Sequence, residues 1–364
     1  MKDFVISGSV FHGGEMKKGT FSTLKGKFVD VSTPSNMEGT LISAPINFHT
    51  HLGDSFIGTE PEGDIDDIVG PGGFKIRALD EAKPSLIKSY IVKSVDFMRE
   101  RGTAAFFDFR ESGIKGLRLA PRLDGITGFF LTRPNTPQEI GPLIDRSAGF
   151  GMSAISDYDF SYLEGLSKAA HGEGKLFALH FSENKRENVG RLIALGPDFV
   201  IHCIEASDSD LDELKRRDIP VSITPRSNIF HGKRPDYSRL FRRGLTVTLG
   251  TDNVFITEPD ILAEAEFLYR YQRKLNRLSP EQVLSAITDN PRIVMKKLNI
   301  KMNEEKFLFF PNEFLTPYQL VTRPNYFPKI LIIKRRDGIT FFPSKHCRYG
   351  VEATWVVMIL SINI

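Results

Sequence analysis

The rhythm of hydrophobic and polar positions changes twice along the chain. Over the first 45 residues, short apolar runs between Gly and Ser-Thr-Pro turns predict strands at 4–7, 19–23, 27–31 and 40–44. From residue 41 to about 290, short apolar runs alternate with amphipathic segments, which is typical of repeated β–α units. Strand-like runs return near the end, at 307–310, 330–333 and 338–342. This pattern predicts a small β unit built from both ends of the chain around a larger α/β unit.

The central part contains enough candidate strands to close a barrel. The eight runs are 41–48, 104–109, 126–131, 152–156, 176–180, 199–203, 221–224 and 245–249. Helices are expected between them at 84–101, 160–174, 185–195, 209–217 and 259–274. Eight alternating strands over roughly 250 residues match a (β/α)₈ barrel. A doubly wound open sheet is the competing fold, but it fits six strands better and usually carries a glycine-rich first turn.

We therefore predict an α/β protein with a TIM barrel over residues 46–300 and a small β-sandwich formed by residues 1–45 and 301–364. The last stretch, 345–364, has no clear pattern. A core of this size folds without a structural metal, so a metal site in this chain is expected to be functional.

Composition narrows the classes of function. The 364 residues carry 48 basic and 45 acidic side chains, a net charge of +3, which gives no electrostatic footprint for nucleic acid. The two cysteines, Cys203 and Cys347, form no disulfide framework and fit a reducing cytoplasm. The N-terminus lacks the apolar stretch of a signal peptide, and the longest apolar run, 353–360, is too short to span a bilayer. A cytoplasmic protein without a membrane partner is expected.

Residues that can bind a metal gather at the ends of predicted strands. His49 and His51 follow the first strand, His180 the fifth, and Asp252 the eighth. Side chains two apart on an extended segment point to the same side, so both histidines of His-Thr-His can reach one ion. Taken singly, His180 fits a core histidine and Asp252 fits a turn residue. Their joint position at one rim of a barrel favours a metal site of His49, His51, His180 and Asp252.

Two neighbours of these residues suit hydrolysis. Glu183 lies three residues after His180 and can move protons between a water and a leaving group, although it also stands near the start of the predicted helix 185–195. His202 can hydrogen-bond the attacking water or the substrate oxygen, or act as a further ligand. Cys203 is expected to be buried and structural.

Five short segments occur in an order typical of one enzyme group. They are Asn-Phe-His-Thr-His at 47–51, His-Phe-Ser-Glu at 180–183, His-Cys at 202–203, Pro-Arg-Ser-Asn at 225–228 and Leu-Gly-Thr-Asp-Asn at 249–253. With them the chain resembles the amidohydrolase superfamily. It is similar in particular to the branch of cytosine, guanine and S-adenosylhomocysteine deaminases and triazine chlorohydrolases.

The resemblance implies roles for individual residues. His49, His51, His180 and Asp252 would hold one divalent metal ion, zinc or, as the alternative, iron(II). Asp252 would accept a proton from the attacking water, and Glu183 would protonate a ring nitrogen and then the departing ammonia. His202 would steady the reacting centre, so that Glu183 and His202 both contact substrate. Ser227 and Asn228 match a supporting loop near the site.

The same resemblance favours one ion over two. A dinuclear site of the dihydroorotase type needs a bridging Lys or Glu at the end of the fourth strand. The segment 151–157 offers Asp157 and no lysine.

The expected reaction is hydrolysis of a C–N bond, with deamination of a nucleobase-like amino-heterocycle as the leading hypothesis. Hydrolysis of a cyclic amide such as an imidazolone ring is the alternative within the enzyme class, and a catalytically silent barrel that binds a partner is the alternative outside it. The expected partner is a small heterocyclic substrate, and assembly into a homo-oligomer is left open.

The segment 53–83, which is long and rich in Gly and acidic residues, is either a lid or a solvated insertion. Phe48, Phe181 and Phe230 are candidates for stacking on a flat ring.

Overall fold

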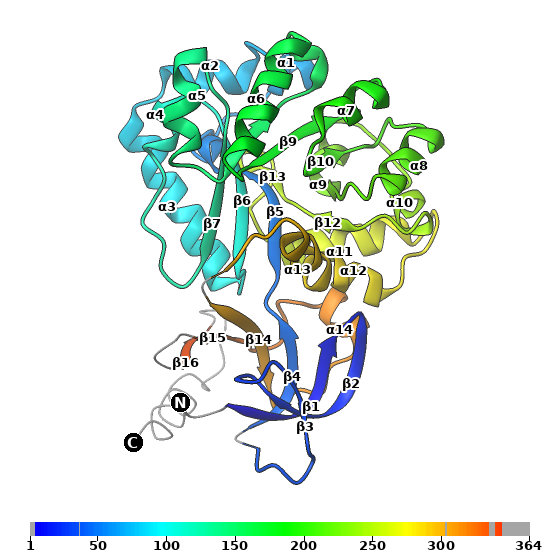
Figure 1. The fold of residues 1–364 in the computed structure, drawn as a ribbon. Coiled ribbons are helices and arrows are strands. Elements are labelled where there is room, and N and C mark those ends of the chain that lie inside the picture. Colours follow the sequence, from blue (N-terminus) through cyan, green and yellow to red (C-terminus); the bar gives the residue numbers. More distant parts are fainter. Residues whose placement is uncertain (1–3, 36, 303, 335–338, 344–364) are drawn as a thin grey trace.

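The computed structural model describes residues 4–343 apart from 36, 303 and 335–338. Its larger sheet is parallel and has nine strands in the order β12-β11-β10-β9-β8-β7-β6-β5-β13 (Figure 1). Their bounds are β5 (Ile46–His51), β6 (Ala105–Arg110), β7 (Thr127–Thr132), β8 (Gly149–Met152), β9 (Leu176–Phe181), β10 (Phe199–His202), β11 (Val221–Ile223), β12 (Val247–Leu249) and β13 (Asp252–Asn253).

The two edges of this sheet belong to one short segment of chain. Gly250 and Thr251 separate β12 from β13, and β13 pairs with β5 through Asp252 opposite Thr50 and Asn253 opposite His51. Asn47 secures the junction, because its amide donates to the Thr251 hydroxyl at 2.8 Å and its carbonyl accepts from the Thr251 backbone at 3.1 Å. The sheet therefore curls into a TIM-like barrel, as the pattern of strands predicted.

The predicted first strand, 41–48, is in fact two strands. β4 (Met37–Ser43) belongs to the smaller sheet, and β5 begins the barrel at Ile46 and includes both His49 and His51. Pro45 lies between them, and a proline has no backbone N–H to continue a ladder. The apolar run is continuous in sequence because both strands are buried.

The predicted fourth strand, 152–156, is also wrong in its bounds. β8 covers Gly149–Met152, and Asp157 lies beyond it in the short helix η3 (Ile155–Asp157). Glycine weakens strand propensity, so the pattern Gly-Phe-Gly did not indicate a strand. The glycines are nevertheless needed there, because a Cβ on Gly149 would lie 2.0 Å from the Leu176 carbonyl oxygen and one on Gly151 would lie 2.6 Å from the Phe109 ring.

Helices fill the connections between the barrel strands. The predictions at 84–101, 160–174 and 209–217 are confirmed, with small shifts. The bounds are η1 (Leu52–Asp54), α1 (Ile65–Val69), α2 (Phe74–Glu81), α3 (Pro84–Glu100), α4 (Gly113–Leu117), η2 (Pro137–Glu139), α5 (Ile140–Ile144), α6 (Phe160–Gly172), α7 (Val189–Leu195), α8 (Asp208–Arg216), α9 (Pro225–Phe230), α10 (Ser238–Arg242), α11 (Ile261–Gln272), α12 (Pro280–Ile287), α13 (Asp289–Lys297) and α14 (Pro317–Thr322).

Two helices begin later than predicted because a side chain caps each of them. Asn188 accepts from the Arg191 backbone and starts α7, rather than Lys185, so Glu183 is not a helix-start residue. Asp260 accepts from Leu262 and Ala263 and starts α11, so Pro259 stands outside that helix.

The smaller sheet combines strands from both ends of the chain, in the order β16-β15-β14-β4-β1-β2-β3. Its remaining members are β1 (Val5–His12), β2 (Glu15–Ser22), β3 (Lys27–Val29), β14 (Glu305–Pro311), β15 (Ile330–Lys334) and β16 (Ile339–Pro343). β4 and β14 pair antiparallel and join the two groups. The two-layered sandwich and the domain limits at 1–45, 46–300 and 301–364 stay predictions, and the segment 345–364 with Cys347 lies outside the described residues.

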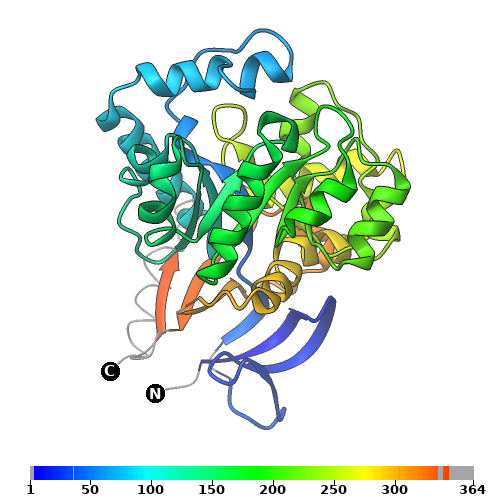
Figure 2. The same ribbon diagram turned by 45° about the horizontal axis from the view of Figure 1, so that its top comes forward.

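The segment between β5 and α3, with α1 and α2, lies at the end of the barrel opposite the smaller sheet (Figures 1 and 2). It follows directly from the carboxyl end of β5, where barrel enzymes carry their sites. Within the described residues, we find no helix that combines the length and apolar character needed to cross a bilayer.

Candidate active site

Three histidines and one aspartate converge at the carboxyl end of the barrel strands. Each of His49, His51, His180 and Asp252 offers one ligand atom, and these atoms all lie within 4.8 Å of one another. His49 Nε2 lies 3.2 Å from His180 Nε2 and 3.3 Å from Asp252 Oδ1, while His51 Nε2 lies 3.5 Å from the same oxygen. All four side chains are buried. The alternation along β5 thus places both histidines of His-Thr-His on one side, as predicted.

Hydrogen bonds fix which nitrogen of two histidines is free. His180 Nδ1 lies 2.8 Å from the Met152 carbonyl oxygen, and His51 Nδ1 lies 3.0 Å from the Phe109 carbonyl oxygen and 2.7 Å from Glu111 Oε1. Because these partners only accept, each Nδ1 carries the proton and each Nε2 presents a lone pair. Two lone pairs and a carboxylate oxygen then face one point, an arrangement that a cation stabilises.

The electrostatics of this group suit metal binding. Burial lowers the pKa of His51 to about 4, with Lys75 acting in the same direction, and burial with His49 lowers the pKa of His180 well below its usual range. Burial alone would raise the pKa of Asp252, but the hydrogen bond with His49, together with the neighbouring histidines, holds this pKa well below its usual range. The site therefore offers neutral imidazoles and a carboxylate near neutral pH, which are the forms that bind metals.

Glu183 and His202 lie beside these donors. His202 Nε2 is 3.2 Å from Glu183 Oε2, and the ligand atoms of Glu183, His202 and Asp252 also lie within 4.8 Å of one another. Burial, with the charge of Asp252, raises the pKa of Glu183 well above its usual range. Burial lowers the pKa of His202 to about 3. A half-buried carboxyl whose pKa is raised thus faces a neutral imidazole.

The Pro-Arg-Ser-Asn segment supports both groups. Ser227 Oγ donates to Asp252 Oδ2 at 2.7 Å, and Asn228 Nδ2 donates to His202 Nδ1 at 3.1 Å. His202 and Asp252 have φ of 72° and 63°, in the left-handed region that non-glycine residues rarely adopt. Cys203 is buried, as predicted, and burial raises the pKa of its thiol.

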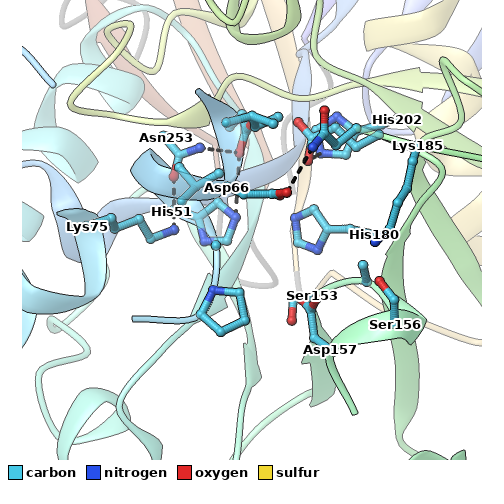
Figure 3. A pocket seen from close by; sticks show the side chains of 18 of the residues that line it. His51, Asp66, Lys75, Ser153, Ser156, Asp157, His180, Lys185, His202 and Asn253 are labelled. Carbon is cyan, nitrogen blue, oxygen red and sulfur yellow. Dashed lines mark hydrogen bonds and ion pairs between the residues drawn. The ribbon is translucent and has the colours of Figure 1, made fainter. Parts of the chain in front are cut away.

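A cavity of about 320 Å³ opens onto these side chains (Figure 3). The predicted residues that line it are His51, His180, Glu183, His202 and Asp252, with Asp157 farther along the wall. Ile65, Asp66, Val69 and Lys75 of the segment 53–83 line it too, so this segment covers the site and is not merely a solvated insertion. Phe48 and Phe181 are fully buried, and neither they nor Phe230 line the cavity, so the proposed ring-stacking role of these three is wrong.

Three charged residues of the site, Lys75, Glu111 and Arg133, were not predicted from the sequence. Glu111 and Arg133 directly follow β6 and β7, and this strand-end position, shared with the predicted residues, was the available signal. Arg133 lines the cavity, and its buried Nε has no hydrogen-bond partner in the described part of the chain. Lys75 lies on α2, and no sequence signal connects it to the strands.

The donor set fits a divalent metal ion. Its nitrogens and carboxylate are ligand types typical of zinc, and four protein donors beside a cavity leave room for a water. The fourth strand ends at Met152, whose carbonyl oxygen holds His180, and neither a lysine nor a glutamate stands at its end. One ion rather than two stays a prediction.

Known proteins of similar sequence include the family that the site suggests. Residues 40–298 match the amidohydrolase family. An uncharacterised protein of Methanocaldococcus jannaschii is 30% identical over 342 residues, covering 84% of this chain and 88% of that protein. A putative aminohydrolase of Archaeoglobus fulgidus is 34% identical over 223 residues, covering 61% of this chain and 66% of that protein.

Solved structures of deaminases share the fold. A zinc-bound adenosine deaminase from Xanthomonas campestris superposes with a TM-score of 0.70 at 14% identity, covering 99% of this chain and 98% of that chain. A 5-methylcytosine deaminase from Klebsiella pneumoniae gives a TM-score of 0.69 at 14% identity, covering 95% and 100%. With the family match over most of the barrel and the buried donor set within it, the chain belongs to the amidohydrolase family and is a metal-dependent hydrolase.

Proposed function

We propose that this protein hydrolytically deaminates a nucleobase-like amino-heterocycle, using one zinc ion held by His49, His51, His180 and Asp252. The observation that carries the proposal is the position of Glu183 and His202 beside the donor set, at the floor of a cavity that a small heterocycle fits. The deaminase activity named for structures of the same fold supports the choice of reaction.

Each residue has a role that its surroundings support. When bound, the cation would lower the pKa of a water molecule toward ~7. Asp252 takes a proton from that water, and Ser227 keeps the carboxylate oriented. Glu183, whose pKa is raised by burial, donates its proton to a ring nitrogen. His202 is neutral and donates a hydrogen bond from Nε2 to the oxygen that adds to the carbon.

The atoms balance as a substitution of oxygen for nitrogen. A C–O bond forms at the amino-bearing carbon, the C–N bond breaks, and the ring nitrogen keeps the proton that Glu183 donated. Of the two protons of the water, the first of which Asp252 accepts, one leaves with ammonia and the other restores Glu183. Water is the co-reactant, and no oxidant or reductant is needed. The heterocycle ends with a carbonyl in place of its amino group.

The test combines metal content with ammonia release. The protein is stripped with a chelator, reloaded with zinc, and incubated with amino-purines, amino-pyrimidines and amino-triazines. We expect one zinc per chain and ammonia from at least one compound, both lost in His49→Ala. His12→Ala, which changes an exposed histidine on β1, is the matched control and should keep both.

Two results would refute the proposal. Protein that takes up neither zinc nor iron would exclude the metal site. Protein that binds metal and opens cyclic amides, while releasing no ammonia from any amino-heterocycle, would replace deamination by ring hydrolysis.

A further inference from the structure

Lys75 is a buried cation that reaches the metal centre from outside the barrel. It lies on α2 in the segment 53–83, and 3% of it is exposed. Its Nζ is 2.6 Å from Glu111 Oε1, donates to Asn253 Oδ1 at 2.9 Å, and lies 3.8 Å from Asp54 Oδ2. In Figure 3 its side chain extends toward His51 and Asn253.

Each of its two closest partners in turn contacts a metal ligand. Glu111 Oε1 is 2.7 Å from His51 Nδ1, and Asn253 Nδ2 donates to Asp252 Oδ1 at 3.0 Å. One ammonium group therefore stands one residue away from both His51 and Asp252. A carboxylate on the outer nitrogen of a ligating histidine helps to fix its tautomer and its ring, so Glu111, together with the Phe109 carbonyl, sets the direction in which His51 Nε2 points.

Because Lys75 and Glu111 are both buried, each needs the other as its charged partner. Burying an ammonium or a carboxylate without a partner is strongly unfavourable, and removing one member of a buried pair leaves the other charge uncompensated. Lys75 is therefore stable in this place only while α2 lies against the barrel and Glu111 is present. In the same way, Glu111 is held beside His51 by a group that the segment 53–83 supplies.

A second contact ties the same segment to the opposite side of the cavity. Asn184 Nδ2 donates to Asp66 Oδ2 at 3.0 Å, joining α1 to the residue that follows Glu183. This contact is exposed, unlike that of Lys75, and an exposed polar pair contributes little to stability. The segment is thus held more firmly at the metal side, through Lys75, than at the Glu183 side, through Asp66.

We propose that Lys75 and Glu111 are positioning residues that couple the metal centre to the closed position of the segment 53–83. The inference rests on the metal site of the proposed function, but not on which C–N bond is cleaved. Coupling is reciprocal: the factor by which closure strengthens metal binding is the factor by which metal binding strengthens closure.

Two measurements on the full-length protein test this coupling. Zinc affinity is measured by chelator competition. Closure is measured by the rate at which a Glu-specific protease cuts after Glu62, which is exposed within the segment. The variants are Lys75→Met, Lys75→Arg and Glu111→Gln, and Lys88→Met on the exposed surface of α3 is the matched control. Circular dichroism confirms that each variant is folded.

In the wild-type protein and in Lys88→Met, zinc should slow cleavage. Lys75→Met should weaken zinc binding about 10- to 100-fold, the range for a partner of a ligating histidine, and zinc should protect its segment less by a similar factor. Lys75→Arg, which keeps the charge, should restore part of both. Glu111→Gln should likewise weaken zinc binding and reduce the protection by zinc. If Lys75→Met does not fold, Glu111→Gln alone tests the coupling. In a double-mutant cycle the two losses should not add.

The inference is overturned if Lys75→Met and Glu111→Gln bind zinc like the wild type, if zinc leaves wild-type cleavage unchanged, or if the wild type binds no divalent metal. Zinc-dependent protection that needs Lys75, without ammonia release, would leave the coupling intact and refute only the proposed reaction. If ammonia is released, and if neither its rate nor its zinc dependence changes in Lys75→Met, the proposed reaction would stand and the coupling would be refuted.

Discussion

At the scale of the residue, the site is organised by groups that fix protons. Asn228 donates to His202 Nδ1, and its Oδ1 accepts from the Tyr237 hydroxyl at 2.9 Å. Because Tyr237 holds the amide in this orientation, His202 Nδ1 must accept and Nε2 must carry the hydrogen. That hydrogen faces Glu183 and the cavity. Tyr237 therefore acts on the site through two residues, without touching the cavity itself.

Removing the Tyr237 hydroxyl tests this chain of contacts. In Tyr237→Phe, Asn228 Oδ1 keeps only its longer contact with Thr224 Oγ1 at 3.5 Å, so the amide orients His202 less firmly. We expect kcat to fall about 10- to 100-fold, the range known for outer partners of metal-site residues. Zinc content should not change, because Tyr237 contacts no metal ligand. Tyr271→Phe, which changes a ring neighbour 6.1 Å away, is the control and should keep its kcat. Equal kcat in both variants would contradict the argument.

Glu183 gives the reaction its expected pH dependence. Burial and Asp252 raise the pKa of Glu183, so the proton that it donates in the proposed reaction is retained to a higher pH than in an ordinary carboxyl. The rate should therefore fall as the pH rises through this pKa. Glu183→Gln cannot donate the proton, so its kcat should be roughly 10²- to 10⁴-fold lower and its profile should lack the alkaline fall. The profile is measured by ammonia release, and an alkaline fall that survives in Glu183→Gln would assign that step to another group.

Whether a residue of the site could be predicted depended on its position relative to the barrel strands. His49, His51, His180, His202 and Asp252 stand at strand ends, and a barrel brings strand ends together, so spacing alone predicted their meeting. Their roles as ligands or catalytic groups stay predictions. Lys75 could not be predicted, because its position depends on how α2 packs onto the barrel. This packing produces no hydrophobic periodicity and no motif that would mark Lys75 in the sequence.

At the scale of the element, the short strand β8 is closely constrained by its neighbours. β8 lies between β7 and β9, and Gly151 leaves room there for the ring of Phe109. That ring packs 4.4 Å from His49 and 5.4 Å from His180, measured between ring centroids. Gly151, which weakened the strand pattern in the sequence, thus makes room for the ring that packs behind two of the proposed metal ligands. Apolar patterning predicted strands such as β10, β11 and β12, whose apolar side chains fill the core, and it misplaced β8, where glycine leaves that space to the Phe109 ring.

A matched pair of glycine substitutions tests this role of β8. In Gly151→Ala the new Cβ would lie 2.6 Å from the Phe109 ring, and the free energy of unfolding should fall by about 1–3 kcal/mol, typical of overpacking. Gly165→Ala lies on α6, where a Cβ meets nothing within 4 Å, and should raise it by roughly 0.5–1 kcal/mol. Urea unfolding measures both. A Gly151→Ala protein as stable as the wild type would mean that Phe109 moves freely.

At the scale of the whole molecule, the metal donors connect the first and last parts of the barrel. His49 and His51 come from β5, Asp252 from β13 and His180 from β9 across the barrel. Asp252 is opposite Thr50 in the ladder that closes the sheet. A cation at this point would therefore stabilise closure, while the metal-free protein keeps several neutral histidines buried together.

The metal-free protein should lose stability on acidification in a defined window. Burial lowers the pKa of His51 to about 4, whereas an unfolded histidine titrates near ~6.5. Between these values the unfolded chain binds the proton and the folded one does not, so the free energy of unfolding falls as the pH decreases from ~6.5 toward 4. The lowered pKa of His51 corresponds to a loss of roughly 3 kcal/mol in the free energy of unfolding once the pH has fallen to about 4. Urea unfolding across that range should show a shallower dependence for His51→Gln than for His12→Gln, and equal slopes would show that His51 is not buried in its neutral form.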